Sequence, residues 1–303
     1  MYGYRRQRPQ LAARTRKSHH VCCAKHQQDC IGFIGILNHD SESRGRAKSH
    51  LEERVDIAAY LRRIGYTGPV TATLPTLRQI HRAHLLAVPF ENLDIPLGRQ
   101  IVCDEDIFVC KIVERRRGGF CYEMNGAFAA LLRAIGFRVT LLSARVPQPD
   151  GSDGPEFDHL TLRVDIEEPW LADVGFGDSF MEPLRLKTGI EQEQEGRRFH
   201  IVDFGELLHV ERAEPGGSWK TEYSFTLKPR HLREFAGMCH YHQTSPESPF
   251  TRKRLCTIAT PEGRITLSDM KLIVTRAGKK QERVLASEEE WREALMEKFG
   301  VVL

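Results

Sequence analysis

The chain has 303 residues, of which 41% are hydrophobic and 28% are charged, and its formal net charge is +3. This composition is that of a globular protein and excludes collagens, coiled coils and fully disordered chains. The longest uncharged apolar run covers residues 30–37, whereas a membrane-spanning helix needs roughly 20 residues. We therefore expect no membrane partner.

Charge is distributed unevenly along the chain. Residues 1–52 hold ten Lys or Arg against four Asp or Glu, whereas residues 53–303 hold 34 basic and 37 acidic residues. A nucleic-acid-binding domain needs basic residues clustered on a folded surface, so we expect no nucleic-acid partner for the larger part. We interpret residues 1–52 as a basic, disordered extension.

The eight cysteines lack the density of a disulfide scaffold and the paired spacings of a zinc ribbon. Reduced thiols and the lack of an export signal predict a cytoplasmic protein. One stretch of residues 1–52 could be drawn as a metal cluster from His19, His20, Cys22, Cys23, His26 and Cys30. Structural zinc sites usually use two spaced ligand pairs, so we predict no metal.

The first ordered part is predicted to be helical and to begin near Glu53. Apolar residues recur at helical spacing in four segments. These are a helix from Val55 that stops at Gly65, one that Pro89 ends, one capped by Asp104, and one from Cys121 to the C-cap Gly136.

After Gly136 the periodicity becomes that of strands. We predict strands at residues 137–146, 157–166, 170–176, 199–204, 207–212 and 223–227. Beyond Pro229 we expect a helical stretch, a loop at 244–249, two or three strands within 251–275, and a final helix from Ser287 with Glu290 completing a capping box. Helices followed by antiparallel strands indicate an α+β protein with segregated domains.

Cys121 has the position of a nucleophile. It follows Gly118 and Gly119 and lies in the first turn of a helix, where free N–H groups and the helix dipole favour a thiolate. The glycines allow a sharp bend and leave room around the sulfur. The alternative is a buried structural cysteine.

A thiol nucleophile needs a base and a group that orients the base. His159 lies on the more polar face of the strand at 157–166, although a surface histidine is the alternative. Asp158, Asp173 and Asp178 are the candidate acids, and Asp173 is unusual because it lies in an apolar strand. A strict hairpin about residue 168 does not select among them.

Several segments carry a family resemblance together. In chain order they are DIAAYLRRIGY at 56–66, PFENLD at 89–94, RRGGFCYEMNG at 116–126, DHL at 158–160 and LADVGFG at 171–177, with weaker matches at 245–250 and 263–268. This series resembles the arylamine N-acetyltransferases from Val55 to the C-terminus. Several motifs in the right order are more specific than any one of them.

The resemblance implies a cysteine-protease-like Cys-His-Asp core built by three domains. These are an N-terminal helical bundle at 53–136 with the cysteine, a central antiparallel β-barrel at 137–227 with the histidine and aspartate, and a C-terminal α/β lid at 228–303. It selects Asp173 as the acid, which implies a bulge or a longer turn than the strict hairpin has.

The resemblance also implies the chemistry. Acetyl-CoA would acylate Cys121 with His159 as base and Asp173 orienting it, and an arylamine or arylhydrazine would then take the acetyl group. One nucleophile that serves two acyl acceptors in turn gives ping-pong kinetics. We expect no permanently bound cofactor.

Substrate contacts follow from the same resemblance. Phe90 and Phe176 correspond to apolar residues near the acceptor pocket. Gly175 and Gly177 would allow close approach, either of the pantetheine arm of CoA or only of their own turn. The oxyanion donor would be the N–H of Cys121 with a partner that the sequence does not identify.

Glu91 and Arg117 correspond to a buried ion pair that braces the catalytic loop. The alternative is two unconnected surface charges.

The family pattern begins at about Glu53. We therefore expect a natural start near Leu51 or Val55, or else a disordered tail or a transit peptide. An amide synthase or a transglutaminase-like acyltransferase would use the same triad. A metal or nucleic-acid binder acting through residues 1–52 is the non-enzymatic alternative.

Overall fold

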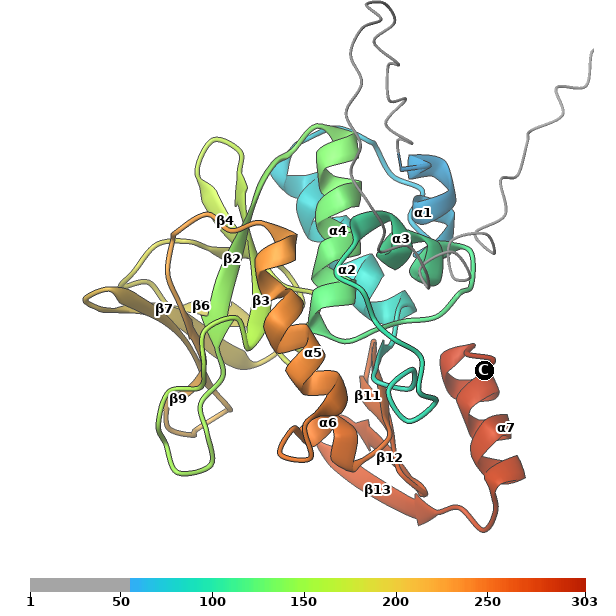
Figure 1. Ribbon diagram of the computed structural model, residues 1–303. Helices are drawn as coiled ribbons and strands as arrows, with labels where there is room; N and C mark the ends of the chain where they lie inside the picture. Colours follow the sequence, from blue (N-terminus) through green and yellow to red (C-terminus); the bar gives the residue numbers. More distant parts are fainter. Residues whose placement is uncertain (1–54) are drawn as a thin grey trace, which may run out of the picture. The chain divides into compact units, whose positions relative to one another are not determined.

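A computed structural model describes residues 55–303 (Figure 1). The described residues 55–303 belong to one compact unit. The expectations for residues 1–52, namely the basic extension, the alternative metal cluster and the start of the chain, lie outside the described residues. Among residues 55–303, no helix is both long and apolar enough to cross a membrane.

The first part of the described chain is helical, as predicted. Its helices are α1 (Ile57–Arg63), α2 (Leu74–Ala87), α3 (Glu105–Val113) and α4 (Cys121–Ile135). Asp56 and Asp104 cap α1 and α3 through their carboxylates, and Gly136 ends α4 in the left-handed conformation with φ of 108°. Figure 1 shows α4 beside β2 (Arg138–Arg145) and β3 (His159–Asp165), which explains why most of this helix is buried.

The central sheet has eight antiparallel strands in the order β5-β4-β3-β2-β9-β8-β7-β6. The remaining strands are β4 (Pro169–Ala172), β5 (Leu184–Arg185), β6 (Gln192–Gln194), β7 (Arg197–Phe204), β8 (Leu207–Ala213) and β9 (Lys220–Phe225). Gln192 joins the two edge strands, because its side chain accepts from the N–H of Arg185 at 2.7 Å and donates to its carbonyl at 3.2 Å. The sheet is therefore a nearly closed barrel.

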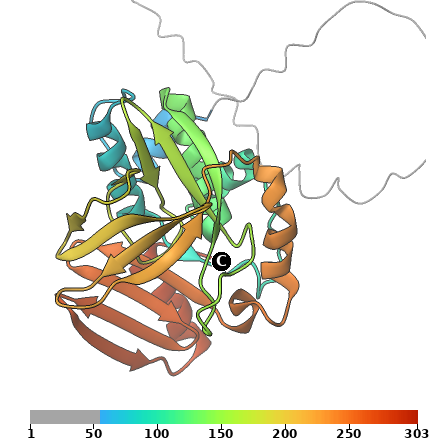
Figure 2. The ribbon, with the colours of Figure 1, turned by 90° about the vertical axis from the view of Figure 1, so that its left-hand side faces the viewer.

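The C-terminal part contains a second antiparallel sheet and three helices. Its strands are β10 (Leu255–Thr260), β11 (Gly263–Ser268), β12 (Lys271–Arg276) and β13 (Lys279–Val284), and its helices are α5 (Ala236–Thr244), α6 (Pro249–Arg252) and α7 (Glu288–Phe299). A short 3₁₀ helix, η2 (Leu232–Phe235), precedes α5. Figure 2 shows this sheet beside the barrel strands, with α5 along one side.

The C-terminal sheet differs from the prediction in two ways. It contains β13, whose sequence KKQERV is exposed along its whole length and has none of the apolar alternation that marks a strand. It also contains β1 (Phe90–Glu91), which leaves the helical part to pair with β10, Phe90 opposite Thr257.

The cap of α7 also differs in detail from the predicted box. Ser287 accepts from the N–H of Glu290, but the Glu290 carboxylate accepts from Ala286, one residue before the cap. The α+β fold class is confirmed, and the three domain boundaries stay a prediction.

Candidate active site

Cys121 is the first residue of α4 and is only 4% exposed. The two glycines before it are required by their neighbours. A Cβ at Gly118 would collide with the carbonyl of Pro89, and one at Gly119 would lie 2.5 Å from Cβ of Glu123. These glycines therefore make room for Pro89 and Glu123, and their expected role in leaving space around the sulfur stays a prediction.

The surroundings of Cys121 act against the thiolate that its place at the start of a helix favours. Burial raises its pKa well above the usual value, and the carboxylates of Asp158 and Asp173 add to this shift. Backbone hydrogen bonds from Leu160 and Tyr122 oppose the rise in pKa without cancelling it. Desolvation outweighs the helix terminus here, so the sulfur needs a base before it can act as a nucleophile.

His159 and Asp173 are paired. Nε2 of His159 lies 2.6 Å from Oδ2 of Asp173, and both side chains are buried. His159 begins β3, whose two faces are both covered, so the imidazole is not a surface residue. Neither Asp158 nor Asp178 is hydrogen-bonded to this ring among the described contacts: Asp158 is 3.0 Å from Nε2 of His242, and Asp178 pairs with Arg197.

The strand register explains how Asp173 reaches His159. Leu162 pairs with Ala172 and Asp165 with Pro169, so the turn is centred on residue 167 and carries neither a bulge nor extra length. The implied bulge or longer turn is therefore wrong. The strand predicted at 170–176 ends at Ala172, and continuing its register places Asp173 diagonally from His159 on the same face.

Further donors hold the Asp173 carboxylate. Its Oδ1 accepts from Nδ2 of Asn125 and from the N–H of Gly175, both at 2.9 Å. Burial raises the pKa of Asp173, but His159 and these hydrogen bonds outweigh burial, so the pKa is lowered. Asp173 is therefore an ionised partner for the imidazole.

Two residues around Asp173 were missed at the sequence level. Asn125 bridges α4, β3 and the segment after β4, and His81 of α2 accepts a hydrogen bond from the Asp173 N–H at 3.1 Å. Asn125 lies four residues after Cys121 within a mostly apolar helix, and this polar residue was the available signal.

Gly175 and Gly177 differ in their surroundings. A Cβ at Gly175 would lie 2.7 Å from Nδ2 of Asn125 and 2.9 Å from Cα of Cys121. Gly175 therefore allows its segment to pack against the start of α4. Gly177 has φ of 97° with open space around it, so its glycine serves the turn.

The aromatic residues of the expected acceptor pocket lie in two groups. The ring of Phe176 lies 5.3 Å from that of His159 and 5.1 Å from that of Tyr223. Phe90 instead packs near Phe250, with ring centres 6.2 Å apart. Tyr223 of β9 and Phe250 of α6 are additions that come from elements distant in sequence.

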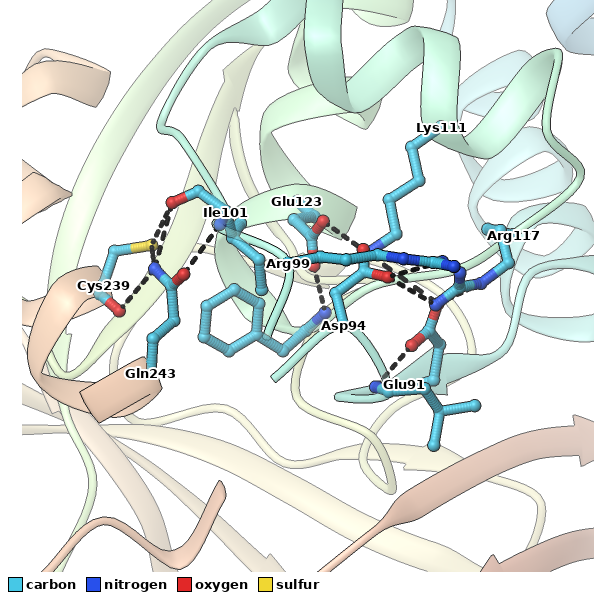
Figure 3. A network of polar contacts seen from close by, with 11 residues as sticks. Glu91, Asp94, Arg99, Ile101, Lys111, Arg117, Glu123, Cys239 and Gln243 are labelled. Carbon is cyan, nitrogen blue, oxygen red and sulfur yellow. Dashed lines mark hydrogen bonds and ion pairs between the residues drawn. The ribbon is translucent and has the colours of Figure 1, made fainter. Parts of the chain in front are cut away.

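The Glu91–Arg117 pair is present and buried, and it belongs to a larger ionic network (Figure 3). Nε of Arg117 donates to Oε1 of Glu91 at 2.9 Å. Nζ of Lys111 lies 2.7 Å from Asp94 and 2.6 Å from Glu123. The network therefore combines three carboxylates with two buried cations, and the exposed Arg99 lies 3.6 Å from Asp94 at its edge.

Glu123 connects this network to the start of α4. Its Oε2 accepts from the Phe120 N–H at 3.1 Å, while Oε1 accepts from Lys111. Burial raises the pKa of Glu123 to about 7; the attraction of Lys111 opposes this rise, and the Glu91 carboxylate adds to it. The residue before Cys121 is thus fixed by a carboxyl group that is itself buried.

Two surface hollows lie away from these groups. One, of about 400 Å³, is lined by residues such as Trp170 and Arg185, and the other, of about 250 Å³, lies against α7. In residues 55–303, no group of three or more His, Cys, Asp or Glu side chains is arranged to hold a metal. The buried seam of α4, β3 and the segment after β4 therefore remains the candidate site, and its thiol, imidazole and carboxylate suit acyl transfer.

Comparison with known proteins agrees with this arrangement. A sequence model of the N-acetyltransferase family matches residues 73–303. The chicken pineal gland arylamine N-acetyltransferase isozyme NAT-3 is 33% identical over 276 residues, covering 82% of this chain and 95% of the relative. Human arylamine N-acetyltransferase 1 is 36% identical over 233 residues, covering 69% and 79%. The structure of the Mycobacterium marinum arylamine N-acetyltransferase in complex with CoA is 31% identical, with a TM-score of 0.76, covering 81% of this chain and 93% of that one.

The fold and the buried thiol, imidazole and carboxylate thus define a cysteine-protease-like acyltransferase. The chain belongs to the arylamine N-acetyltransferase family.

Proposed function

We propose that this enzyme transfers the acetyl group of acetyl-CoA to arylamines and arylhydrazines through an acetyl-Cys121 thioester. The observation that carries the proposal is the His159–Asp173 pair, 2.6 Å apart, in the same buried seam as the start of α4. The CoA complex of the M. marinum relative supports acetyl-CoA as donor.

In the first half-reaction the Cys121 sulfur attacks the thioester carbonyl. Because Nε2 of His159 is bonded to Asp173, Nδ1 is the nitrogen that takes the thiol proton. The carbonyl carbon–sulfur bond of acetyl-CoA then breaks, and the CoA sulfur leaves with that proton. The N–H of Cys121, at the first turn of α4, is one donor to the developing oxyanion.

In the second half-reaction the acceptor amine attacks the acetyl-Cys121 carbonyl. His159 takes a proton from the amine and returns it to the Cys121 sulfur as the thioester breaks. Asp173 holds the imidazole in the tautomer that has its proton on Nε2 and stabilises the imidazolium formed in each half-reaction.

Phe90, Phe176 and Gly177 form the substrate contacts in this proposal. Phe176 supports it because its ring lies against His159, where a planar acceptor would lie beside the base. Glu91 and Arg117 brace the segment that leads to Cys121.

Mass spectrometry of the intact protein tests the proposal. Incubation with acetyl-CoA should add one acetyl group on Cys121, and a subsequent arylamine should remove it. An acetyl group mapped to another residue, or no acetylation at all, would contradict the mechanism. Transfer of an acyl group from other thioesters but not from acetyl-CoA would favour an amide synthase.

A further inference from the structure

Two helices that both precede Asp173 in the sequence, α2 and α4, hold this residue through hydrogen bonds to its backbone and its carboxylate. We propose that Asn125 of α4 and His81 of α2 are positioning residues that together fix Asp173 against His159. The inference rests on the proposed function, since it gives these residues a role in the acylation of Cys121.

Asn125 fixes the carboxylate end of Asp173. Its amide nitrogen donates to the carbonyl of Leu160 at 2.6 Å and to Oδ1 of Asp173 at 2.9 Å, and its oxygen accepts from the N–H of Val174 at 2.9 Å. The side chain is completely buried. All of its hydrogen bonds therefore join α4 to the strand that begins with His159 and to the segment that contains Asp173.

The position of Asn125 on α4 links these hydrogen bonds to Cys121. Asn125 lies one helical turn after Cys121, so the same rigid helix carries the nucleophile and the amide that holds the acid. With Oδ1 occupied by Asn125 and the Gly175 N–H, Oδ2 is directed at Nε2 of His159. Helix α4 thus fixes the position of the Cys121 thiol relative to the His159–Asp173 pair.

His81 fixes the backbone of Asp173. An amide N–H can only donate, so Nε2 of His81 must accept from Asp173, at 3.1 Å. Its Nδ1 then carries the proton and donates to the carbonyl of Met181 at 2.9 Å. This neutral tautomer spans the start and the end of the segment 173–181.

Burial is consistent with a neutral imidazole at this position. The His81 side chain is fully buried, and its ring stacks on Phe180 and meets the edge of Phe128. Burial lowers its pKa to about 4, although the Met181 carbonyl and Asp173 oppose this fall. His81 therefore acts as a hydrogen-bonding strut rather than as a second base.

Asn92 offers a matched control for Asn125. It is also buried, it donates to two carbonyls, of Phe250 and Lys253, and it accepts from the N–H of Leu255. Its bonds join β1 to the C-terminal part. Asn125→Ala and Asn92→Ala thus each remove three side-chain hydrogen bonds of a buried asparagine, but only the first removes one to Asp173.

His84 is the corresponding control for His81. It lies on the same helix, is equally buried and contacts Phe128, but its Nε2 is bonded to the hydroxyl of Tyr60 at 3.0 Å. His81→Phe and His84→Phe both keep an aromatic ring in place. Only His81→Phe removes a hydrogen bond to Asp173.

The experiment measures single-turnover acetylation of the full chain by acetyl-CoA, together with thermal unfolding. Asn125→Ala and His81→Phe should lower the acylation rate constant on the order of 10²-fold, the size expected when reacting groups are displaced by about 1 Å, with little change in the apparent affinity for acetyl-CoA. Asn92→Ala and His84→Phe should lower the melting temperature comparably and leave the acylation rate of the folded fraction within about threefold of wild type.

Asn125→Asp adds a readout that a purely structural role would not move. A carboxyl group at position 125 would share a proton with Asp173. The other titratable groups that interact with Asp173 are His159, His81, Cys121, Tyr223 and Glu222. The acylation defect of Asn125→Asp should therefore grow as the pH rises, whereas the defect of Asn125→Ala should not follow this ionisation.

Equal acylation defects in the variants and their controls, or normal acylation in Asn125→Ala and His81→Phe, would overturn the inference. If Asn125→Ala does not fold, the pH profile of Asn125→Asp and the acylation rate of His81→Phe test the inference. If His81→Phe does not fold, the two Asn125 variants test it. Failure of the wild-type enzyme to form acetyl-Cys121 would instead contradict the proposed function.

Discussion

A buried thiol with a raised pKa reacts only when a base removes its proton, so the proposal depends on individual residues around Cys121. Cys121→Ala should reduce acetyl transfer by at least about 10⁴-fold, because the nucleophile is lost. Cys239→Ala should retain it, since that buried cysteine bonds to the carbonyl of Ile101, at 3.8 Å, and to Gln243. Steady-state turnover with an arylamine measures both, and full activity of Cys121→Ala would refute the role of its sulfur.

Gly175 supports a second prediction at this scale. Gly175→Ala would force a methyl group against Cα of Cys121 and the amide of Asn125, so we expect lost stability and impaired acylation together. Gly205→Ala is the control: it has φ of 79° and open space, so it should cost only about 1 kcal/mol of stability through backbone strain and leave acylation intact. Unfolding midpoints and single-turnover rates compare the two variants. Normal acylation in Gly175→Ala would show that this close contact does not position the site.

The residues alone did not determine which aspartate pairs with His159. Alternation predicted the strand at 157–166 and identified Asp173 as an acid in an apolar setting, but a one-residue difference in the turn changes every pair across the hairpin. Asn125 and His81 were hidden for a related reason. Their partners lie 48 and 92 residues away in sequence, and local periodicity carries no such distances.

At the scale of elements, the start of α4 depends on the buried carboxyl group of Glu123. Its pKa of about 7 lies above the ordinary value of 4.5, so the folded protein keeps a proton that the unfolded chain loses between these values. The free energy of unfolding should therefore fall as the pH rises from about 4.5 to 7, by about 3 kcal/mol in total, and stay reduced above that range.

Glu123→Gln tests this prediction by removing the titration. The difference in urea-unfolding free energy between pH 5 and pH 8 should shrink by about 2.5 kcal/mol in this variant, since part of the titration lies below pH 5. Glu297→Gln, at an exposed position of α7, should keep the wild-type difference. An unchanged difference in Glu123→Gln would mean that Glu123 is ionised in the folded protein throughout.

Helices proved easier to predict than strands in this chain. Caps such as Asp104, Gly136 and Ser287 mark helix ends locally, and all three lie where they were expected. The strand β13 lacks an apolar face, and β1 is too short to show a pattern. Both exist because a neighbouring strand offers them hydrogen-bonding partners.

At the scale of the whole molecule, the family resemblance covers residues 55–303 and leaves residues 1–52 outside. A chain that starts at Glu53 should therefore keep arylamine acetylation within about twofold of the full chain. Turnover and thermal unfolding of both chains measure this. Loss of activity without loss of folding would assign a role in catalysis to the N-terminal residues.

The first and the third predicted domains pack against each other next to Cys121. Phe235 and Phe250 of the C-terminal part pack against Tyr122 and Phe120, which flank Cys121. A chain ending at residue 227 should therefore lose cooperative unfolding, because it exposes these rings. Urea titration followed by circular dichroism tests this, and a sharp transition in the shortened chain would show that the first two domains fold without the third.

The pairing of β1 with β10 has a consequence for synthesis. Phe90 leaves the ribosome long before its partner Thr257, and the contact closes a loop of well over a hundred residues. During translation β1 therefore has no strand to pair with, and the ring of Phe120 lacks its contact with Phe250, until the C-terminal part has been made. The nucleophile is made in the first half of the chain, but its surroundings are completed only near the end of synthesis.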